Sequence, residues 1–102
     1  MKIYNKLVRD KIPQVIQKSG KKPVVKILSE AQYKKALDQK LKEEIKEYSK
    51  SKTVEELADI EEIILAILKV RRISNSEFNK IRIQKAKERG SFNNRIKLVK
   101  VT

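Results

Sequence analysis

Three amino-terminal helix caps constrain the fold of this 102-residue chain more than any other feature. Ser29, Thr53 and Ser74 each stand three residues before a Gln or Glu, which is the spacing of a capping box. The pattern predicts one helix from Ser29 to about residue 49 and a second from Thr53 to about residue 71. A third should begin after Ser74 and end at Arg89, because Gly90 favours a helix stop. The predicted fold class is therefore mainly all-α.

The segments outside these three helices carry weaker signals. Pro13 predicts a short helix that begins near Asp10 and ends before Gly20. Residues 24–28 are mostly β-branched and apolar, and residues 95–101 roughly alternate, so we expect two short extended segments that could pair as strands. No internal repeat or Gly-, Ser- or Pro-rich linker divides the chain, so residues 1–102 are predicted to form a single domain.

Composition removes several kinds of chemistry. The chain has no Cys and no His, which excludes disulfides, thiolate or imidazole metal ligands and the usual nucleophile–base pairs. Carboxylates, lysines, hydroxyls and hard metal ions bound through oxygen remain. No apolar stretch approaches the ~20 residues of a membrane span, and the amino terminus lacks the apolar core of a secretory signal. We therefore expect a cytoplasmic protein with no membrane partner.

The charge of the chain is large and unevenly distributed. Lys and Arg number 26 against 13 Asp and Glu, and the net charge of +13 first suggests a nucleic-acid partner. Residues 43–62, however, hold eight of the acids and three bases, a net charge of −5 that leaves +18 elsewhere. A basic helical nucleic-acid-binding module explains the positive remainder and is an alternative function. It does not explain the acidic cluster, so a nucleic-acid partner is disfavoured.

The positions of the acidic residues on the predicted helices are informative. At about 100° per residue, Glu44 falls within the apolar stripe of its helix, and Glu47 lies at the border of that stripe. Glu56 and Asp59 share a helical row with Ile63 on the next helix. If the two helices pack antiparallel, the two carboxylate pairs face each other. Crowded carboxylates must be neutralised either by Lys and Arg or by a divalent cation such as Mg²⁺ or Mn²⁺, and both explanations remain open.

Three motifs together are similar to those of a known family. They are Glu44-x-x-Glu47 followed by Glu56-x-x-Asp59, the opening YNKLVRDKIP at residues 4–13, and KAKERGSF at residues 85–92. In this order they resemble the MazG-like all-α nucleotide pyrophosphohydrolases, and in particular the phosphoribosyl-ATP pyrophosphohydrolase-like branch. The resemblance extends over essentially the whole chain.

This resemblance implies Mg²⁺-dependent hydrolysis between the α- and β-phosphates of a nucleoside triphosphate or related nucleotide, with Mn²⁺ as a possible substitute. By motif match, Glu44, Glu47, Glu56 and Asp59 become the catalytic metal ligands, and Glu62 matches a further acidic position. A polyphosphate also requires cations opposite the metal. The candidates are the basic residues of the first and last motifs, namely Lys6, Arg9, Lys11, Lys85 and Arg89.

Family subunits pair into helical bundles, so the resemblance also implies a homodimer or a tetramer. The third predicted helix suits such pairing, because residues 63–68 are apolar on almost all sides. A further alternative is a catalytically idle homologue that has kept the fold and serves as an interaction protein. Neither the base and sugar of the substrate nor the number of subunits follows from these residues.

Overall fold

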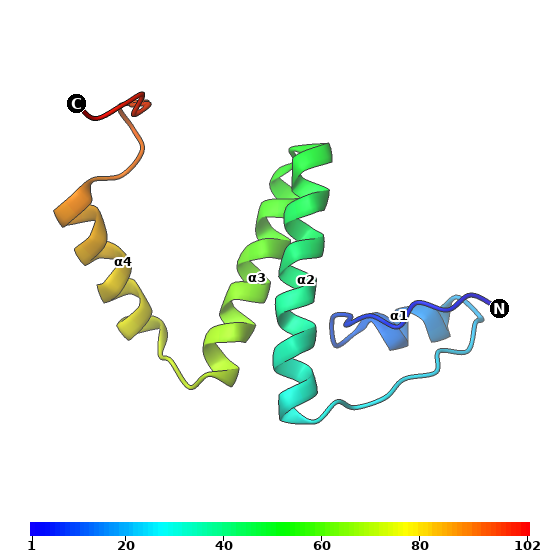
Figure 1. Cartoon of the computed structure of the whole chain (residues 1–102). Helices are drawn as coiled ribbons and strands as arrows, with labels where there is room; N and C mark the ends of the chain where they lie inside the picture. The colour runs from blue at the N-terminus through cyan, green and yellow to red at the C-terminus, as the bar shows by residue number, and fades with distance from the viewer.

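The structure, a computed structural model, describes residues 1–102 and is entirely helical (Figure 1). Its four helices are α1 (Ile12–Lys18), α2 (Glu30–Ser51), α3 (Val54–Val70) and α4 (Asn75–Arg89). The predicted all-α fold class is therefore confirmed. No helix is both long and apolar enough to cross a membrane.

The three predicted caps all form, but only the first is a complete capping box. At α2, the Ser29 hydroxyl accepts from the Gln32 amide at 3.2 Å, and the Gln32 side chain accepts from the Ser29 amide at 3.1 Å. Thr53 accepts from the amide of Glu56 in α3, and Ser74 accepts from the Glu77 amide in α4, without the reciprocal bond. The sequence pattern thus predicted the three helix starts correctly, but the reciprocal side-chain bond of a capping box forms only at α2.

Helices α2 and α3 form an antiparallel hairpin and lie side by side in Figure 1. The turn between them uses Lys52 in the left-handed conformation (φ 57°), whose amide donates to the Tyr48 carbonyl at 2.8 Å. The core lies between these two helices and contains the buried side chains of Leu37, Ile63 and Leu68. Apolar burial in the hairpin therefore fixes which faces of α2 and α3 meet.

The other two helices are less closely packed. Helix α4 contacts only α3 and diverges from the hairpin after the turn at residues 71–74, while α1 lies beside α2 without close helix–helix packing (Figure 1). The molecule is elongated, with extents of 61 × 32 × 23 Å. As a result, large apolar side chains such as Ile81 and Ile83 on α4 remain exposed.

The two segments that we expected to be extended do not pair as strands. Residues 24–28 and 95–101 form no strand, no backbone hydrogen bond joins them, and they lie on different sides of the molecule (Figure 1). Val24 and Val99 are 98% and 82% exposed, so neither segment has a surface on which to pack. Alternating apolar residues favour a strand only where a neighbouring strand accepts its hydrogen bonds, and here no neighbour is present.

Candidate functional site

The antiparallel packing of α2 and α3 brings three acidic side chains together near the turn that joins the helices. Glu44, Glu56 and Asp59 each place one carboxylate oxygen so that all three oxygens lie within 4.8 Å of one another. We call these three residues the acidic triad. They come from the two halves of the first motif, Glu44-x-x-Glu47 on α2 and Glu56-x-x-Asp59 on α3, which the packing of the helices brings together.

The local sequence explains where these side chains lie. Glu44 follows Leu37 by seven residues, which is two turns of α2, so it points into the same interface and its side chain is only 13% exposed. Glu56 and Asp59 lie in the first two turns of α3, in the row that continues to the buried Ile63. The apolar contacts that form the hairpin therefore also hold the carboxylates together.

Glu56 has the least compensated carboxyl group in the triad. Its Oε2 atom is buried and has no hydrogen-bond partner. Hydrogen bonding to Glu44, then partial burial, and then the negative charges of Glu44, Asp59 and Glu47 all raise the pKa of Glu56 above its ordinary value of 4.5. The triad therefore needs additional positive charge if all its carboxyls are to be ionised.

Three basic side chains supply part of that charge. Arg9 Nη2 lies 2.6 Å from Asp59 Oδ1, and Lys6 Nζ lies 3.7 Å from Glu43 Oε1 at the edge of the triad. Lys40 Nζ lies 3.4 Å from Glu44 Oε1 and 3.5 Å from Glu43 Oε1. The segment that carries Lys6 and Arg9 thus reaches an acidic surface about fifty residues away in the sequence.

Sequence reasoning did not single out Lys40, although its side chain is only 18% exposed and it contacts two of the acids. A signal was available, because Lys40 precedes Glu44 by four residues and Glu43 by three, and both spacings place side chains on one helix face. In a chain with 26 Lys and Arg residues, this spacing alone did not distinguish Lys40 from the other lysines.

The remaining candidate residues lie outside the triad. Glu47 is exposed and affects Glu56 only through its charge, and Glu62 is exposed further along α3. Lys11 stands at the N-cap position of α1 without a side-chain capping bond, and it forms no ion pair with the acids. Lys85 and Arg89 are exposed on α4 and likewise make no ion pair with the triad. Within this chain, only Lys6 and Arg9 of the five basic candidates pair with acids at the site.

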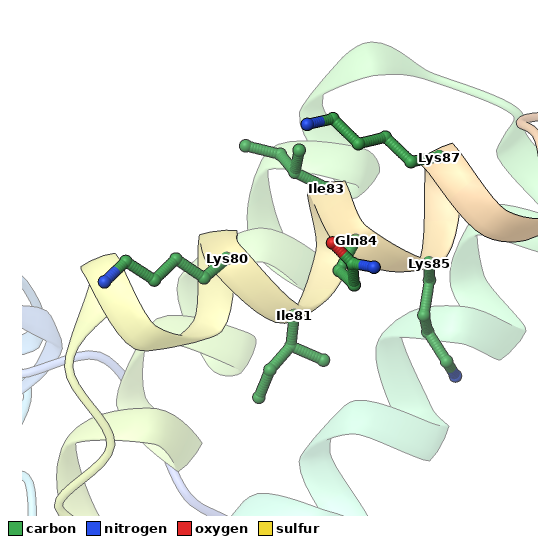
Figure 2. Close-up of a pocket in the computed structure, with 6 residues that line it drawn as sticks. All are labelled: Lys80, Ile81, Ile83, Gln84, Lys85 and Lys87. Atoms are coloured by element: carbon green, nitrogen blue, oxygen red, sulfur yellow. The ribbon is translucent and has the colours of Figure 1, made fainter.

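Figure 2 shows a shallow hollow that includes one of these residues, Lys85. Its six lining residues all come from α4, and the side chains of Ile81 and Ile83 extend to opposite sides of the helix. The hollow contains no acidic side chain. It is therefore a stretch of exposed helix surface, separate from the acidic triad.

Known proteins match the chain only over part of its length. An uncharacterized protein of Mycolicibacterium smegmatis is 54% identical over 41 residues, which make up 40% of this chain and 42% of that protein. The chain thus spans less than half of the relative that it matches. No family model and no solved structure matches the chain.

Proposed function

We propose that the chain is a Mg²⁺-dependent nucleotide pyrophosphohydrolase of the MazG-like kind, in which Mn²⁺ can replace Mg²⁺. The substrate would be a nucleoside triphosphate or a related nucleotide, hydrolysed between its α- and β-phosphates to a monophosphate and pyrophosphate. The observation that carries this proposal is the acidic triad, in which Glu44, Glu56 and Asp59 converge from two helices.

The donor set suits a hard divalent cation. All three groups are carboxylates, the ligand type that Mg²⁺ and Mn²⁺ prefer, and the buried Oε2 of Glu56 has no other partner. Glu44, Glu56 and Asp59 would hold the ion, and Glu47 and Glu62 are nearby exposed carboxylates on the same helices. When bound, the ion would neutralise phosphate oxygens and favour attack by water.

The surrounding residues provide the remaining functions of such a site. Water would add across the P–O–P linkage, so that one phosphorus–oxygen bond forms and the bond to the leaving pyrophosphate breaks. Glu47 is exposed beside the triad and can accept the proton that the water loses. Lys6 and Arg9 lie next to the acids and can bind the outer phosphates. This chemistry requires neither His nor Cys.

A second copy of the chain is part of the proposal, as a homodimer or a tetramer. The chain exposes 9938 Å², whereas a compact monomer of 11.9 kDa exposes roughly 5,900 Å². Apolar residues of α3 contribute to this excess, including Leu65, which is 41% exposed. Pairing through such faces would bury them, and it would also give Lys85 and Arg89 the opportunity to meet the triad of another subunit.

The direct test is release of pyrophosphate from a panel of nucleotides in the presence of Mg²⁺. We expect Glu44→Gln and Asp59→Asn to lose more than the roughly 10- to 100-fold in rate that follows loss of a residue supporting a metal ligand. Glu61→Gln is the matched control, because it removes the same charge from an exposed position of α3. The compartment that we propose for this activity is the cytoplasm.

The outcomes separate this function from its alternatives. If no nucleotide of the panel releases pyrophosphate, or if both triad variants release it as fast as the native protein, the proposed enzyme activity is wrong. Affinity for duplex DNA that falls steeply with salt and persists in the triad variants would instead support the basic nucleic-acid-binding module. Metal binding without any hydrolysis would support an idle homologue that acts as an interaction protein.

A further inference from the structure

The segment that precedes α1 places cations on the acidic surface of the hairpin. Residues 1–11 contain no helix, and the chain turns at Asn5, which has a φ of 45°. The segment then directs Lys6 towards Glu43 at 3.7 Å and Arg9 towards Asp59 at 2.6 Å. One member of the acidic triad is thus already paired with a cation from the chain itself.

This pairing sets Arg9 in competition with a divalent cation. The Arg9 guanidinium stands at hydrogen-bond distance from Asp59, whose carboxylate would also be a ligand of the ion. Two cations beside one carboxylate repel each other, and each reduces the gain from binding the other. Arg9 and a divalent cation would therefore compete for the Asp59 carboxylate.

The two basic side chains at the triad differ in their freedom to leave. Lys40 is fixed on α2 and only 18% of its side chain is exposed, whereas the side chain of Arg9 is 57% exposed on a segment without regular structure. Moving Arg9 breaks one exposed ion pair, which costs little. Moving Lys40 would break two ion pairs, with Glu43 and Glu44, and expose a side chain that is mostly covered.

We propose that residues 1–11 form a displaceable strap, in which Arg9 leaves Asp59 when the divalent cation binds and then becomes available to a phosphate of the substrate. This inference concerns the regulation of the same site and rests on the proposed function. Residues 1–11 would therefore weaken metal binding in the free protein and strengthen nucleotide binding once the metal is present. Arg9 affects the metal indirectly, through Asp59, whereas its contact with the substrate phosphate would be direct.

The first test measures the affinity of the full chain for Mn²⁺ alone, by titration without nucleotide. We expect Arg9→Gln to bind Mn²⁺ about two- to five-fold more tightly than the native protein, the range that an exposed ion pair supports. The matched control is Arg72→Gln, since Arg72 lies 4.0 Å from Glu30 and forms an exposed pair at the other end of α2. That end is about 21 Å from Glu44 along the helix. Equal or weaker Mn²⁺ binding by Arg9→Gln would overturn the strap.

The second test follows the strap directly. The chain has no cysteine, so Lys2→Cys carries a single nitroxide label on the segment, and Ser76→Cys carries one on α4 as the control. We expect Mg²⁺ to increase the mobility of the label at position 2 and to leave the label at position 76 unchanged. Mg²⁺ that binds without this change would overturn the strap but leave the metal site intact. Absence of any metal binding would overturn the metal-dependent function and the strap together.

Discussion

Glu44 of α2 and Glu56 of α3 are neighbours at the turn end of the hairpin, with a carboxylate oxygen of each within 4.8 Å of the other, and Glu44 raises the pKa of Glu56. They are twelve residues apart in the sequence, with the turn of the hairpin between them. Because Glu44 lies on α2 and Glu56 on α3, the pKa of Glu56 depends on how these two helices pack. It also determines how the stability of the free protein should depend on pH.

The first prediction concerns pH in the presence of a chelator. The folded protein raises the pKa of Glu56 above 4.5, so the folded state binds more protons than the unfolded state between these two values. Stability should therefore rise as the pH falls through the raised pKa, and the gain should be complete below 4.5. We expect Glu56→Gln to raise the melting temperature at neutral pH, and the difference to shrink in acid.

Circular dichroism melting across this pH range checks the prediction. Glu55→Gln is the control, because Glu55 is adjacent in sequence but exposed, and it should shift the melting temperature little at any pH. A lower melting temperature of Glu56→Gln at neutral pH without metal would show that the carboxylate is already compensated in the folded protein.

The second prediction concerns the addition of metal. Mg²⁺ or Mn²⁺ at 100 times its dissociation constant should stabilise the native protein by about 2.7 kcal/mol, because the unfolded chain has no assembled triad. Glu44→Gln and Asp59→Asn should lose most of this gain, and Glu61→Gln should keep it. Thermal melting with and without a chelator measures the effect. A gain of equal size in all variants would mean that the ion binds elsewhere.

The third prediction concerns the complete capping box of α2. Ser29→Ala should lower the free energy of unfolding by about 1 kcal/mol, because the Gln32 amide loses its acceptor. Ser76→Ala, at an exposed position of α4, should leave the free energy unchanged or slightly increased, because alanine favours a helix. Urea unfolding of both variants measures this difference. An equal loss of unfolding free energy in both would show that the Ser29 cap has no specific stabilising effect.

The fourth prediction concerns the apolar face of α3. If a second copy covers Leu65, then Leu65→Lys should shift the protein towards the monomer, because a lysine buried in a subunit interface loses its hydration. Ser76→Lys adds the same group at an exposed polar position of α4 and should leave the assembly unchanged. Analytical ultracentrifugation measures the mass of each variant. Unchanged assembly in Leu65→Lys would place the interface elsewhere.

The sequence predicted the parts of the site that depend on contacts within one helix better than those that depend on packing between helices. The motif pairs located all three triad residues, since helical periodicity placed Glu44, Glu56 and Asp59 on inward faces. The motif match added Glu47, which periodicity placed at the border of the apolar stripe, and Glu62, but both are exposed outside the triad. Helical angle places a residue on its own helix, but whether a border residue reaches the facing helix depends on how the two helices cross.

The basic candidates show the same limit more strongly. Five were named from their motifs, and the fold brings Arg9 to Asp59 and Lys6 to Glu43 while leaving Lys85 on a diverging helix. Motif membership carries no information on where an irregular segment or a loosely packed helix lies. Lys40 was missed because its spacing to Glu43 and Glu44 does not stand out among so many lysines.

The sequence by itself determined the four helices, because caps, proline, glycine and 3.6-residue periodicity act within a few residues of chain. It also excluded thiol and imidazole chemistry, because the chain has no Cys and no His. Only the tertiary structure decided which of them meet: Glu44 with Glu56 and Arg9 with Asp59, while the two expected strands have no partner. The physical reason is that such contacts depend on apolar burial between segments far apart in the chain, which local preferences do not specify.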